Sequence, residues 1–308
     1  MAVTAADVKA LREKTGVGMM DCKKALTEAD GDMERAIDVL REKGLAASAK
    51  KAGRIAAEGI VLAYTDEAKK VSVLVEVNSE TDFVAKNEKF VNYVTAVAKT
   101  IADTNPADVD ELLAKPLAGD TRTVQENLQD MVLSIGENMK IRRFERVEGI
   151  TTSYIHGGGS VGVLVMFDTD DKTAATDAFK VMGKDVAMQI AAMSPAYLDE
   201  ASVPADVLAH EKEITKAQLA EDPKMAGKPE QVLAKIVDGK IVKYFKENCL
   251  LDQAFVKDGD MNVAKYVASV AKELGADIKV TGFIRYAKGE GLEKREDDFA
   301  AEVASMMK

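Results

Sequence analysis

The sequence is poor in the residues that build disulfide frameworks and many catalytic or metal sites. Among its 308 residues it has two cysteines, Cys22 and Cys249, and two histidines, His156 and His210. The cysteines lie too far apart for a metal-binding or redox spacing, which argues against a disulfide framework and suits a reducing cytoplasm. A lone imidazole lacks the second base or ligand that acid–base catalysis or a zinc site needs. We therefore expect no cofactor and no bound metal.

Long apolar segments and an excess of positive charge are also missing. The stretches richest in apolar residues, Val71–Val77 and Val161–Phe167, span about seven residues, against roughly 20 for a transmembrane helix. The chain begins with a charged, amphipathic stretch rather than the apolar core of a signal peptide. Its 42 basic and 52 acidic residues give a net charge of −10, which disfavours binding to nucleic acid or an anionic membrane. These features predict a cytoplasmic protein that binds neither.

The first part of the chain predicts a small helical domain. Apolar spacing over residues 1–44 indicates three short helices, the first capped by Thr4 and the third ended by Gly44. Residues 45–54 carry three basic side chains and no acid, so we interpret them as a linker. Residues 1–54 would then form a three-helix domain with its linker, a unit that usually serves as an adaptor.

An internal repeat follows at a constant offset of 90 residues. Between residues 58–78 and 148–168, eight of 21 positions are identical, where average residue usage gives about one. In each copy, β-branched runs flank a polar turn, which indicates a β-hairpin. Helical periodicity follows each hairpin. Whether the two copies share one sheet or pack as twin subdomains stays open at this stage.

The repeat sets the predicted domain plan, which is of the α+β class. Residues 55–145 and 146–289 would be two related α+β subdomains, each a β-hairpin followed by helices. Residues from about 199 to 246 have no counterpart in the first copy and predict a helical hairpin. An apolar-faced helix pair of this kind often forms a dimer contact. Residues 290–308 would form a C-terminal helical module.

The turn HGGGSVG, residues 156–162, imitates catalytic signatures without their context. It satisfies GxGxxG and GxSxG and begins like an oxyanion-type HGGG string. A dinucleotide site and a nucleophile elbow both need a helix directly after the turn, whereas a strand is predicted here. The first copy has an ordinary turn, DEAKK, at the same place. We therefore expect no enzyme, and an activity that uses Ser160 is the alternative that Ser160→Ala would test.

One segment of the first copy has no equivalent in the second. Residues 81–86, TDFVAK, leave a strand and lead into a helix near Asn87, whereas the second copy has no aromatic residue at this place. Thr81 or Asp82 could cap a helix, with Phe83 as its first core residue. Alternatively, a phenylalanine presented on a loop would be an anchor for a partner. The residues alone leave both interpretations open.

The N-terminal stretch LREKTGVGMMDCKKAL, residues 11–26, has a similar character. Met19 and Met20 lie beside Gly16 and Gly18, where apolar side chains are hard to bury. Adjacent methionines at a turn are typical of an adaptable docking patch. The alternative is that one methionine belongs to the core and the other is exposed by chance.

These two stretches closely resemble the two signatures of the bacterial elongation factor Ts family. The similarity also includes the SYIHGG turn, the segment QAFV (253–256) and the ending VTGFIRYAKGEGLEK, so it covers essentially the whole chain. The sequence departs from the family's pattern at two places. Val17 stands where the family usually has Ala, and Ser160-Val161 stand where a basic residue followed by Ile is expected.

The resemblance implies a guanine nucleotide exchange factor for elongation factor Tu, the GTPase that delivers aminoacyl-tRNA to the ribosome. Such a factor binds the GDP-loaded GTPase, displaces magnesium and promotes GDP release so that GTP can rebind. The family also implies a ubiquitin-associated-like fold for the three-helix domain and a dimerisation role for the helical hairpin. A non-catalytic adaptor or chaperone-like protein using the three-helix domain is the alternative, and it predicts binding without faster nucleotide release.

The resemblance also assigns roles to individual residues of this sequence. The element that displaces magnesium corresponds to Thr81, Asp82, Phe83 and Val84. The docking face for the G domain of the partner corresponds to Arg12, Met19, Met20 and Lys23. His156 resembles a further partner contact. None of these roles needs a reactive group, because an exchange factor only has to bind the empty GTPase more tightly than the loaded one.

Overall fold

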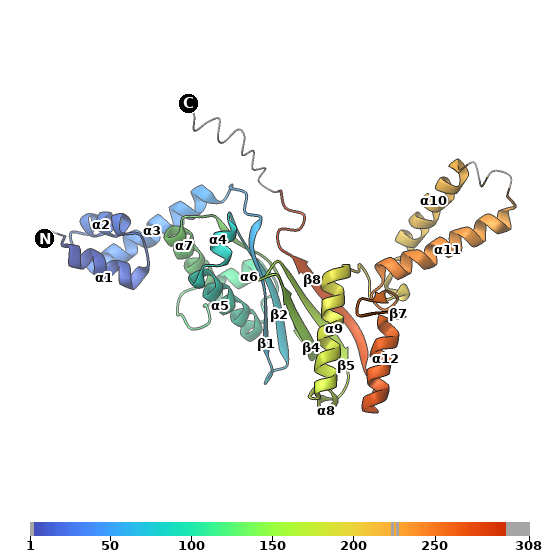
Figure 1. Cartoon of the computed structure of the whole chain (residues 1–308). Helices are drawn as coiled ribbons and strands as arrows, with labels where there is room; N and C mark the ends of the chain where they lie inside the picture. The colour runs from blue at the N-terminus through green and yellow to red at the C-terminus, as the bar shows by residue number, and fades with distance from the viewer. Residues whose placement is uncertain (1–2, 223–224, 226–227, 294–308) are drawn as a thin grey trace. The chain divides into compact units, whose positions relative to one another are not determined.

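The computed structural model describes residues 3–222, 225 and 228–293, and Figure 1 shows the order of its helices and strands. The mixture of helices and small sheets confirms the predicted α+β class. Contacts divide the chain into two compact units. The first contains the residues up to Val147, Ile155–Gly162 and those from Tyr286, and the second contains Glu148–Tyr154 and Val163–Arg285.

The first unit begins with the three predicted helices, α1 (Ala5–Thr15), α2 (Met19–Glu28) and α3 (Met33–Lys51). Thr4 caps α1 in a capping box with Asp7, as the sequence predicted. The helices share a small core of apolar side chains, which includes Leu11, Cys22, Leu26, Ala36 and Leu40. This core makes the N-terminal part of the chain a packed helical domain.

The predicted linker after Gly44 is wrong, because α3 continues through this glycine to Lys51. Gly44 is buried, and α3 packs along α7 (Val124–Ile135). A glycine inside a helix costs about 1 kcal/mol relative to alanine, but this packing and the Ala- and Lys-rich sequence around it favour the helix. At the end of α3, Lys51 Nζ donates a hydrogen bond to the Val132 carbonyl at 3.3 Å. The three-helix domain is therefore joined to the next subdomain by a helix.

The first repeat forms β1 (Glu58–Asp66) and β2 (Val71–Ser79), an antiparallel hairpin whose register runs from Glu58 opposite Ser79 to Asp66 opposite Val71. A third strand, β3 (Met139–Glu148), completes the order β1-β2-β3. Four helices belong to this subdomain, α4 (Asp82–Ala85), α5 (Glu88–Thr104), α6 (Val109–Ala114) and α7. The sequence did not predict β3 or α6. In β3, five charged side chains from Lys140 to Arg146 hide the apolar alternation of a strand.

Strand β2 is buried on both faces. Its odd-numbered residues, Val71 to Val77, lie in one core with apolar side chains of α5 and α7. The opposite face carries Leu74 and Glu76, and segments from much later in the chain cover it. The N–H of Gly289 donates to Glu76 Oε1 at 2.8 Å. The chain after the last strand therefore completes the first subdomain.

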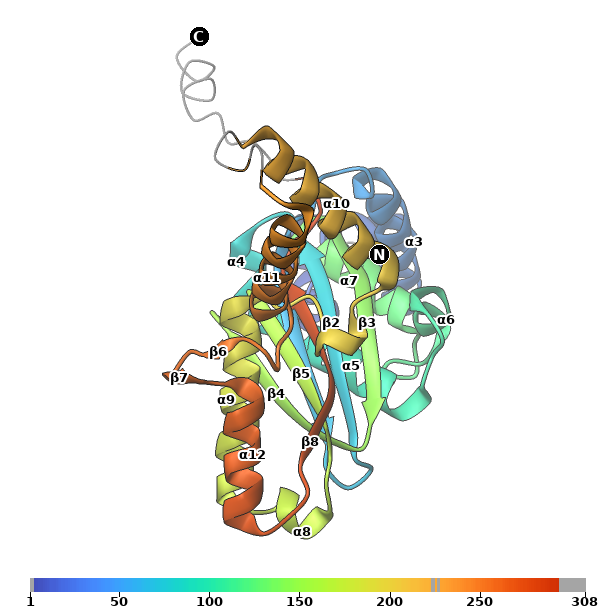
Figure 2. The same cartoon turned by 90° about the vertical axis from the view of Figure 1, so that its right-hand side faces the viewer.

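The second repeat builds a sheet of its own from β4 (Ile150–His156), β5 (Val161–Asp168) and β8 (Lys279–Ala287), in the order β4-β5-β8. This result decides the question that the sequence left open, since the two copies do not share one sheet. A short helix α8 (Asp171–Ala174) and the helices α9 (Asp177–Met193) and α12 (Val263–Leu274) accompany the sheet. Helices α9 and α12 run side by side (Figure 2). The rings of Phe167 and Phe179 meet edge to face at 5.0 Å between centroids.

The predicted helical hairpin is confirmed as α10 (Ala205–Glu221) and α11 (Glu230–Asn248), which pack against each other (Figures 1 and 2). Their contacts form a separate apolar cluster of Val203, Leu219, Val237, Ile241, Phe245 and Cys249. Two short strands, β6 (Ala254–Phe255) and β7 (Asp258–Asn262), follow. The helix predicted within residues 290–308 lies outside the described residues. None of the helices in the described ranges combines the length and the apolar character that crossing a bilayer requires.

Candidate functional site

Helix α4 exposes Phe83 to solvent while burying its neighbour. The Phe83 side chain is 79% exposed, whereas Val84 is 4% exposed and belongs to the core of the first subdomain. The interpretation of Phe83 as the first core residue of its helix is therefore wrong, and Val84 has that place instead. A large aromatic side chain exposed on a turn that its neighbour fixes is a suitable interface anchor.

The second repeat has the same short helix without the aromatic side chain. Helix α8 occupies the place of α4, and both have four residues. In each helix the first two residues are exposed and the third, Val84 or Thr173, is buried. The position of Phe83 is taken by Lys172 in α8. The repeated scaffold thus directs this position outward in both copies, and only the first copy places a phenylalanine there.

Of the two residues that could cap α4, Thr81 is the N-cap residue and Asp82 is not. Thr81 occupies the N-cap position, but its Oγ1 donates to Glu137 Oε1 at 2.7 Å and makes no cap hydrogen bond. Asp82 is the first residue of the helix, and its Oδ2 accepts a hydrogen bond from Lys86 Nζ at 2.8 Å. This hydrogen bond and the charge of Lys86 lower the pKa of Asp82, with a smaller contribution from Lys288. Asp82 is therefore an ion-paired carboxylate beside Phe83.

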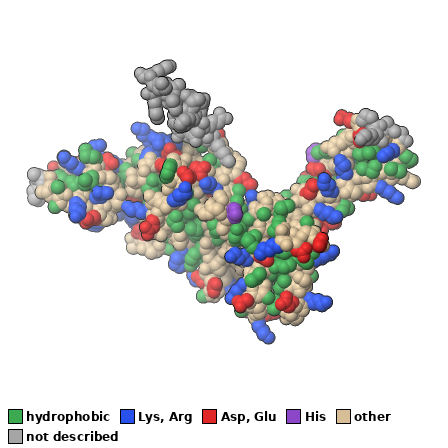
Figure 3. Space-filling view, in the orientation of Figure 1, with side chains coloured by type: hydrophobic (Ala, Val, Ile, Leu, Met, Phe, Trp, Pro, Cys, Tyr) green, Lys and Arg blue, Asp and Glu red, His purple; other side chains and the backbone are tan. Residues whose placement is uncertain are grey.

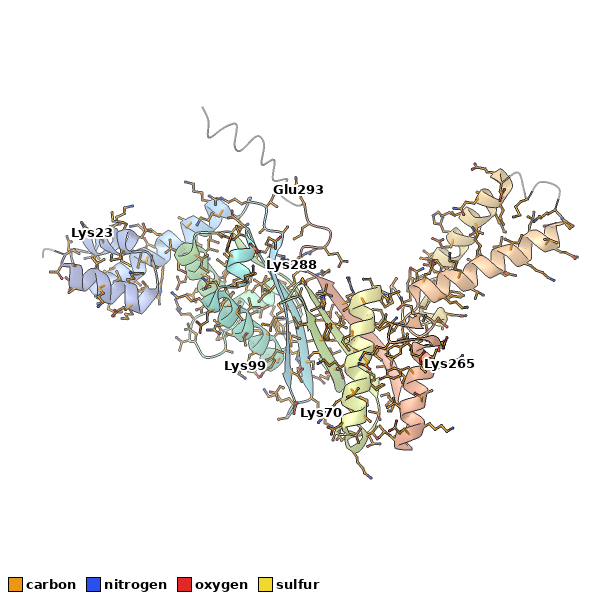
Figure 4. All side chains as sticks on the ribbon, viewed as in Figure 1. Lys23, Lys70, Lys99, Lys265, Lys288 and Glu293 are labelled. Carbon is orange, nitrogen blue, oxygen red and sulfur yellow. The ribbon has the colours of Figure 1, made fainter. Side chains whose placement is uncertain are left out.

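Lys288, which is labelled in Figure 4, connects the region of α4 with the turn that contains His156. Its backbone N–H donates to the Ser160 carbonyl at 2.8 Å, and its ammonium group donates to the carboxylate of Glu58. Lys288 lies 205 residues after Phe83, that is 288 minus 83, and no sequence pattern links the two. Only the fold reveals that Lys288 is part of this region.

The turn 156–160 has the geometry of a structural turn between two strands. Strand β5 begins directly after it, at Val161, so the helix required by a nucleotide loop or a nucleophile elbow does not follow. Ser160 Oγ donates to the His156 carbonyl at 3.0 Å, and the carbonyl of Gly159 accepts a hydrogen bond from the Val61 N–H at 2.8 Å. His156 itself is exposed. In the ranges that the structure describes, no group of three or more His, Cys, Asp or Glu side chains could hold a metal ion.

The second predicted surface lies at the start of α2. Met19 and Met20 are 55% and 65% exposed, so the alternative in which one of them is a core residue is wrong. The predicted neighbours Arg12 and Lys23 are exposed as well. In this part of α2 the residue that enters the core of the three helices is Cys22, and burial raises the pKa of its thiol.

A shallow depression of about 360 Å³ lies along the outer face of α2. It is lined by Met20, Lys23, Lys24, Thr27 and Glu28. Figure 4 labels Lys23 on this domain, and Figure 3 shows hydrophobic and basic side chains next to each other over its surface. Apolar contact area flanked by ammonium groups suits a protein surface that carries negative charge.

Both predicted surfaces belong to the first compact unit. Arg54, just after α3, forms an ion pair with Glu80 at 3.3 Å, next to the turn that leads into α4. The α1–α2 turn at Gly16 lies close to the ammonium group of Lys89 on α5. The structure therefore places Phe83, His156 and the methionine pair on one unit, although they come from three separate parts of the sequence.

Known proteins resemble this chain over nearly its whole length. The family model described as Elongation factor TS matches residues 80–290. Elongation factor Ts of Clostridium perfringens (strain 13 / Type A) is 53% identical over 307 residues, which cover 99% of this chain and 99% of that protein. Elongation factor Ts of Clostridium kluyveri (strain NBRC 12016) is 52% identical over 305 residues, with 98% and 97% covered. That of Clostridium novyi (strain NT) is 50% identical over 309 residues, with 99% of each chain covered. Because this similarity extends over nearly the whole length, the chain belongs to the elongation factor Ts family.

Proposed function

We propose that this protein is a guanine nucleotide exchange factor for elongation factor Tu and is not itself an enzyme. It would bind the GDP-loaded GTPase, displace magnesium and promote GDP release, so that GTP can rebind during translation elongation. Family membership supports this proposal. A role in translation elongation would place the protein in the cytoplasm. The observation that carries the proposal is the exposure of Phe83 on a helix whose next residue is buried.

The exchange mechanism follows from linkage. A GTPase holds GDP through its phosphate loop and a magnesium ion that bridges phosphate oxygens. Bound nucleotide lowers the affinity of the GTPase for the exchange factor by a certain ratio. By linkage, the bound exchange factor lowers the affinity of the GTPase for nucleotide by the same ratio. Loosening GDP by 10⁵-fold requires roughly 7 kcal/mol of differential contact, at about 1.4 kcal/mol per decade. Burying one phenylalanine supplies only about 1.5–3 kcal/mol, so other contacts must supply the remainder.

The described surfaces offer these contacts. We assign the magnesium-displacing contact to Thr81, Asp82, Phe83 and Val84, with Phe83 as the side chain that enters an apolar pocket of the GTPase. Met19 and Met20, with Arg12 and Lys23, would bind the G domain elsewhere, and His156 would add a third contact. Each of these side chains except Thr81 and Val84 is exposed, as a binding role requires. Val84 would act by fixing α4 in the core.

The helical hairpin would pair with a second copy of the chain. Its two helices already form one apolar cluster, so they do not need a partner to bury their shared face. Other apolar side chains remain exposed on the hairpin, namely Ile214 on α10 and Val232 and Val242 on α11. In Figure 3 hydrophobic side chains are visible along the hairpin between charged ones. These residues would supply the apolar part of a dimer contact.

The decisive experiment measures GDP release from elongation factor Tu. The GTPase is loaded with a fluorescent GDP, mixed with excess unlabelled nucleotide, and followed by stopped flow at increasing concentrations of this protein. We expect release to accelerate by several decades and to saturate. An adaptor would bind the GTPase without accelerating release, and this outcome would sink the proposal.

A further inference from the structure

The turn before α4 and the turn before β3 hold each other through two carboxylates. Glu137 accepts two hydrogen bonds from Thr81, from the backbone N–H at 2.9 Å and from Oγ1 at 2.7 Å. In the opposite direction, Glu80 Oε1 accepts from the backbone N–H of Asn138 at 2.6 Å and from Arg54 Nη1 at 3.3 Å. We call Glu80, Thr81, Glu137 and Asn138 the reciprocal clamp.

The second repeat holds its short helix in a different way. Asp170, at the N-cap of α8, accepts hydrogen bonds from the N–H of Thr173 at 2.9 Å and from Thr173 Oγ1 at 2.9 Å. This is an ordinary local cap, made within four residues. In α4 the corresponding side chain, Thr81, is turned away from its own helix and toward Glu137, 56 residues later in the sequence. The clamp therefore belongs to the copy that carries Phe83.

A helix of four residues has little stability of its own. Forming the first turn fixes several backbone torsions for one hydrogen bond, so isolated turns of this length do not persist in water. Phe83 contributes little to fixing α4, because most of its side chain is in solvent. The contacts that order α4 include the buried Val84, the Asp82–Lys86 ion pair and the clamp, together with the partly buried Ala85 and a hydrogen bond from Ser79 Oγ to the Thr81 carbonyl. A turn that is ordered before binding avoids an entropic cost on association.

We propose that Glu137 is a positioning residue for the partner contact. Through its two hydrogen bonds to Thr81 it orders α4 in the free protein and sets the direction in which Phe83 points. It need not touch the partner, and it takes no part in displacing magnesium. This inference rests on the proposed exchange function and adds to it a residue outside the segment Thr81–Val84. The sequence alone did not single out Glu137.

The test compares Glu137→Ala with Asp170→Ala as a matched control. Each substitution removes a carboxylate that accepts one backbone and one hydroxyl hydrogen bond at the start of a four-residue helix. The rate of fluorescent GDP release from elongation factor Tu is measured against the concentration of each variant. For Glu137→Ala we expect the half-saturating concentration to rise about tenfold, while the maximal rate stays within about twofold. Asp170→Ala should match the wild type, and Glu137→Gln should lie between, because an amide offers one acceptor oxygen instead of two.

A measurement without the partner separates the two proposals. Hydrogen exchange is followed at the amides of Lys86 and Asn87, which donate to the carbonyls of Phe83 at 3.2 Å and Val84 at 2.9 Å. Glu137→Ala should speed their exchange about tenfold, and Asp170→Ala should not change it. If the wild type fails to accelerate GDP release, the proposed function fails, and this exchange measurement still decides whether Glu137 orders α4.

Three outcomes would overturn the inference while the wild type remains an active exchange factor. The first is an unchanged half-saturating concentration in Glu137→Ala. The second is unchanged amide exchange at Lys86 and Asn87. The third is a fall in the maximal rate equal to that of Phe83→Ala, because Glu137 would then act in nucleotide displacement itself. If Glu137→Ala does not fold, Glu137→Gln is held to the same criteria with an expected change of about threefold.

Discussion

Phe83 and Val84 are neighbours in α4, yet one side chain lies in solvent and the other in the core of the first subdomain. Because the two side chains point in opposite directions, the Phe83 side chain is available for binding while the Val84 side chain contributes to folding. A change at Phe83 removes contact area that the free protein does not use. A change at Val84 removes packing that holds the same helix in place. The two residues therefore form a matched pair for experiment.

Phe83→Ala should leave the melting temperature within a few degrees of the wild type, because an exposed side chain contributes little to folding. The complex with elongation factor Tu should weaken by about 1.5–3 kcal/mol, and GDP release should slow by roughly one to two decades. Val84→Ala should instead lower the free energy of unfolding by about 2 kcal/mol. Thermal unfolding and stopped-flow release measure both quantities. A large loss of stability in Phe83→Ala with a normal exchange rate per complex would refute the role as anchor.

The double variant Met19→Ala/Met20→Ala should weaken the complex by about 2 kcal/mol, or roughly 30-fold in dissociation constant, because both exposed thioethers lose their contact with the partner. The far-UV spectrum and the melting temperature should hardly change. Leu26→Ala, in the core of the same three helices, should destabilise this domain by about 2–5 kcal/mol. Titration calorimetry with elongation factor Tu measures the affinity. An unchanged affinity in the double variant would remove these methionines from the partner contact.

Glu76 is a fully buried carboxylate at the centre of the first sheet. Its Oε2 accepts from Arg143 Nε at 2.7 Å, and its Oε1 accepts from Arg142 Nη1 at 3.1 Å and from the Gly289 N–H at 2.8 Å. Burial by itself would raise the pKa of Glu76, but the Gly289 N–H, the Asn78 amide and Arg143 together lower it below its usual value. The ionised carboxylate is thus the form that the folded protein favours.

Glu76→Gln should lower the free energy of unfolding by about 2–4 kcal/mol at pH 7, because two guanidinium groups lose a buried counter-charge. A lowered folded-state pKa gives stability that is fully present above the unfolded value, about 4.3, and is lost as the pH falls through the folded value. The difference between wild type and variant should therefore shrink on acidification below about pH 4. Urea unfolding of both proteins at pH 7 and at pH 3.5 measures this difference in the free energy of unfolding. Equal differences at both pH values would show that the charge of Glu76 does not stabilise the fold.

Replacing residues 205–241 by a short Gly-rich link should reduce self-association and leave both sheets folded. The apolar contacts of α10 and α11 form their own cluster, and the first repeat builds its sheet without such an insert. Sedimentation should shift towards the monomer, while the far-UV spectrum keeps its mixed helix and strand character. Ile214→Glu/Val242→Glu, a pair of surface changes on the intact hairpin, should have the same effect on sedimentation. If the shortened chain is unfolded, the hairpin is part of the core; if the wild type is monomeric throughout, the proposed dimer is wrong.

Much of the fold followed from local patterns. The capping residue Thr4 and the turns of the two hairpins depend on a few neighbouring positions, and these features appear in the structure as predicted. The predictions failed where distant contacts outweighed local preference. Gly44 is typical of a helix end, but α3 continues past it to Lys51 because the helix packs against α7. Charged side chains hide β3, because two of its arginines are held by Glu76, which lies 66 and 67 residues earlier.

Local patterns in the sequence were enough to predict the class of fold, the repeat, the family and the two segments that carry Phe83 and the methionine pair. Periodicity and signature residues are local properties, so they can be recognised without coordinates. Whether Phe83 lies in the core or on the surface depends on tertiary packing, because Phe83 and Val84 are both apolar and differ in which side chains surround them. The same holds for Glu137 and Lys288, whose partners are 56 and more than 100 residues away in the chain. The packing of sheets and helices determines which hydrogen-bond donor lies next to a given carboxylate. A local sequence pattern does not contain this information.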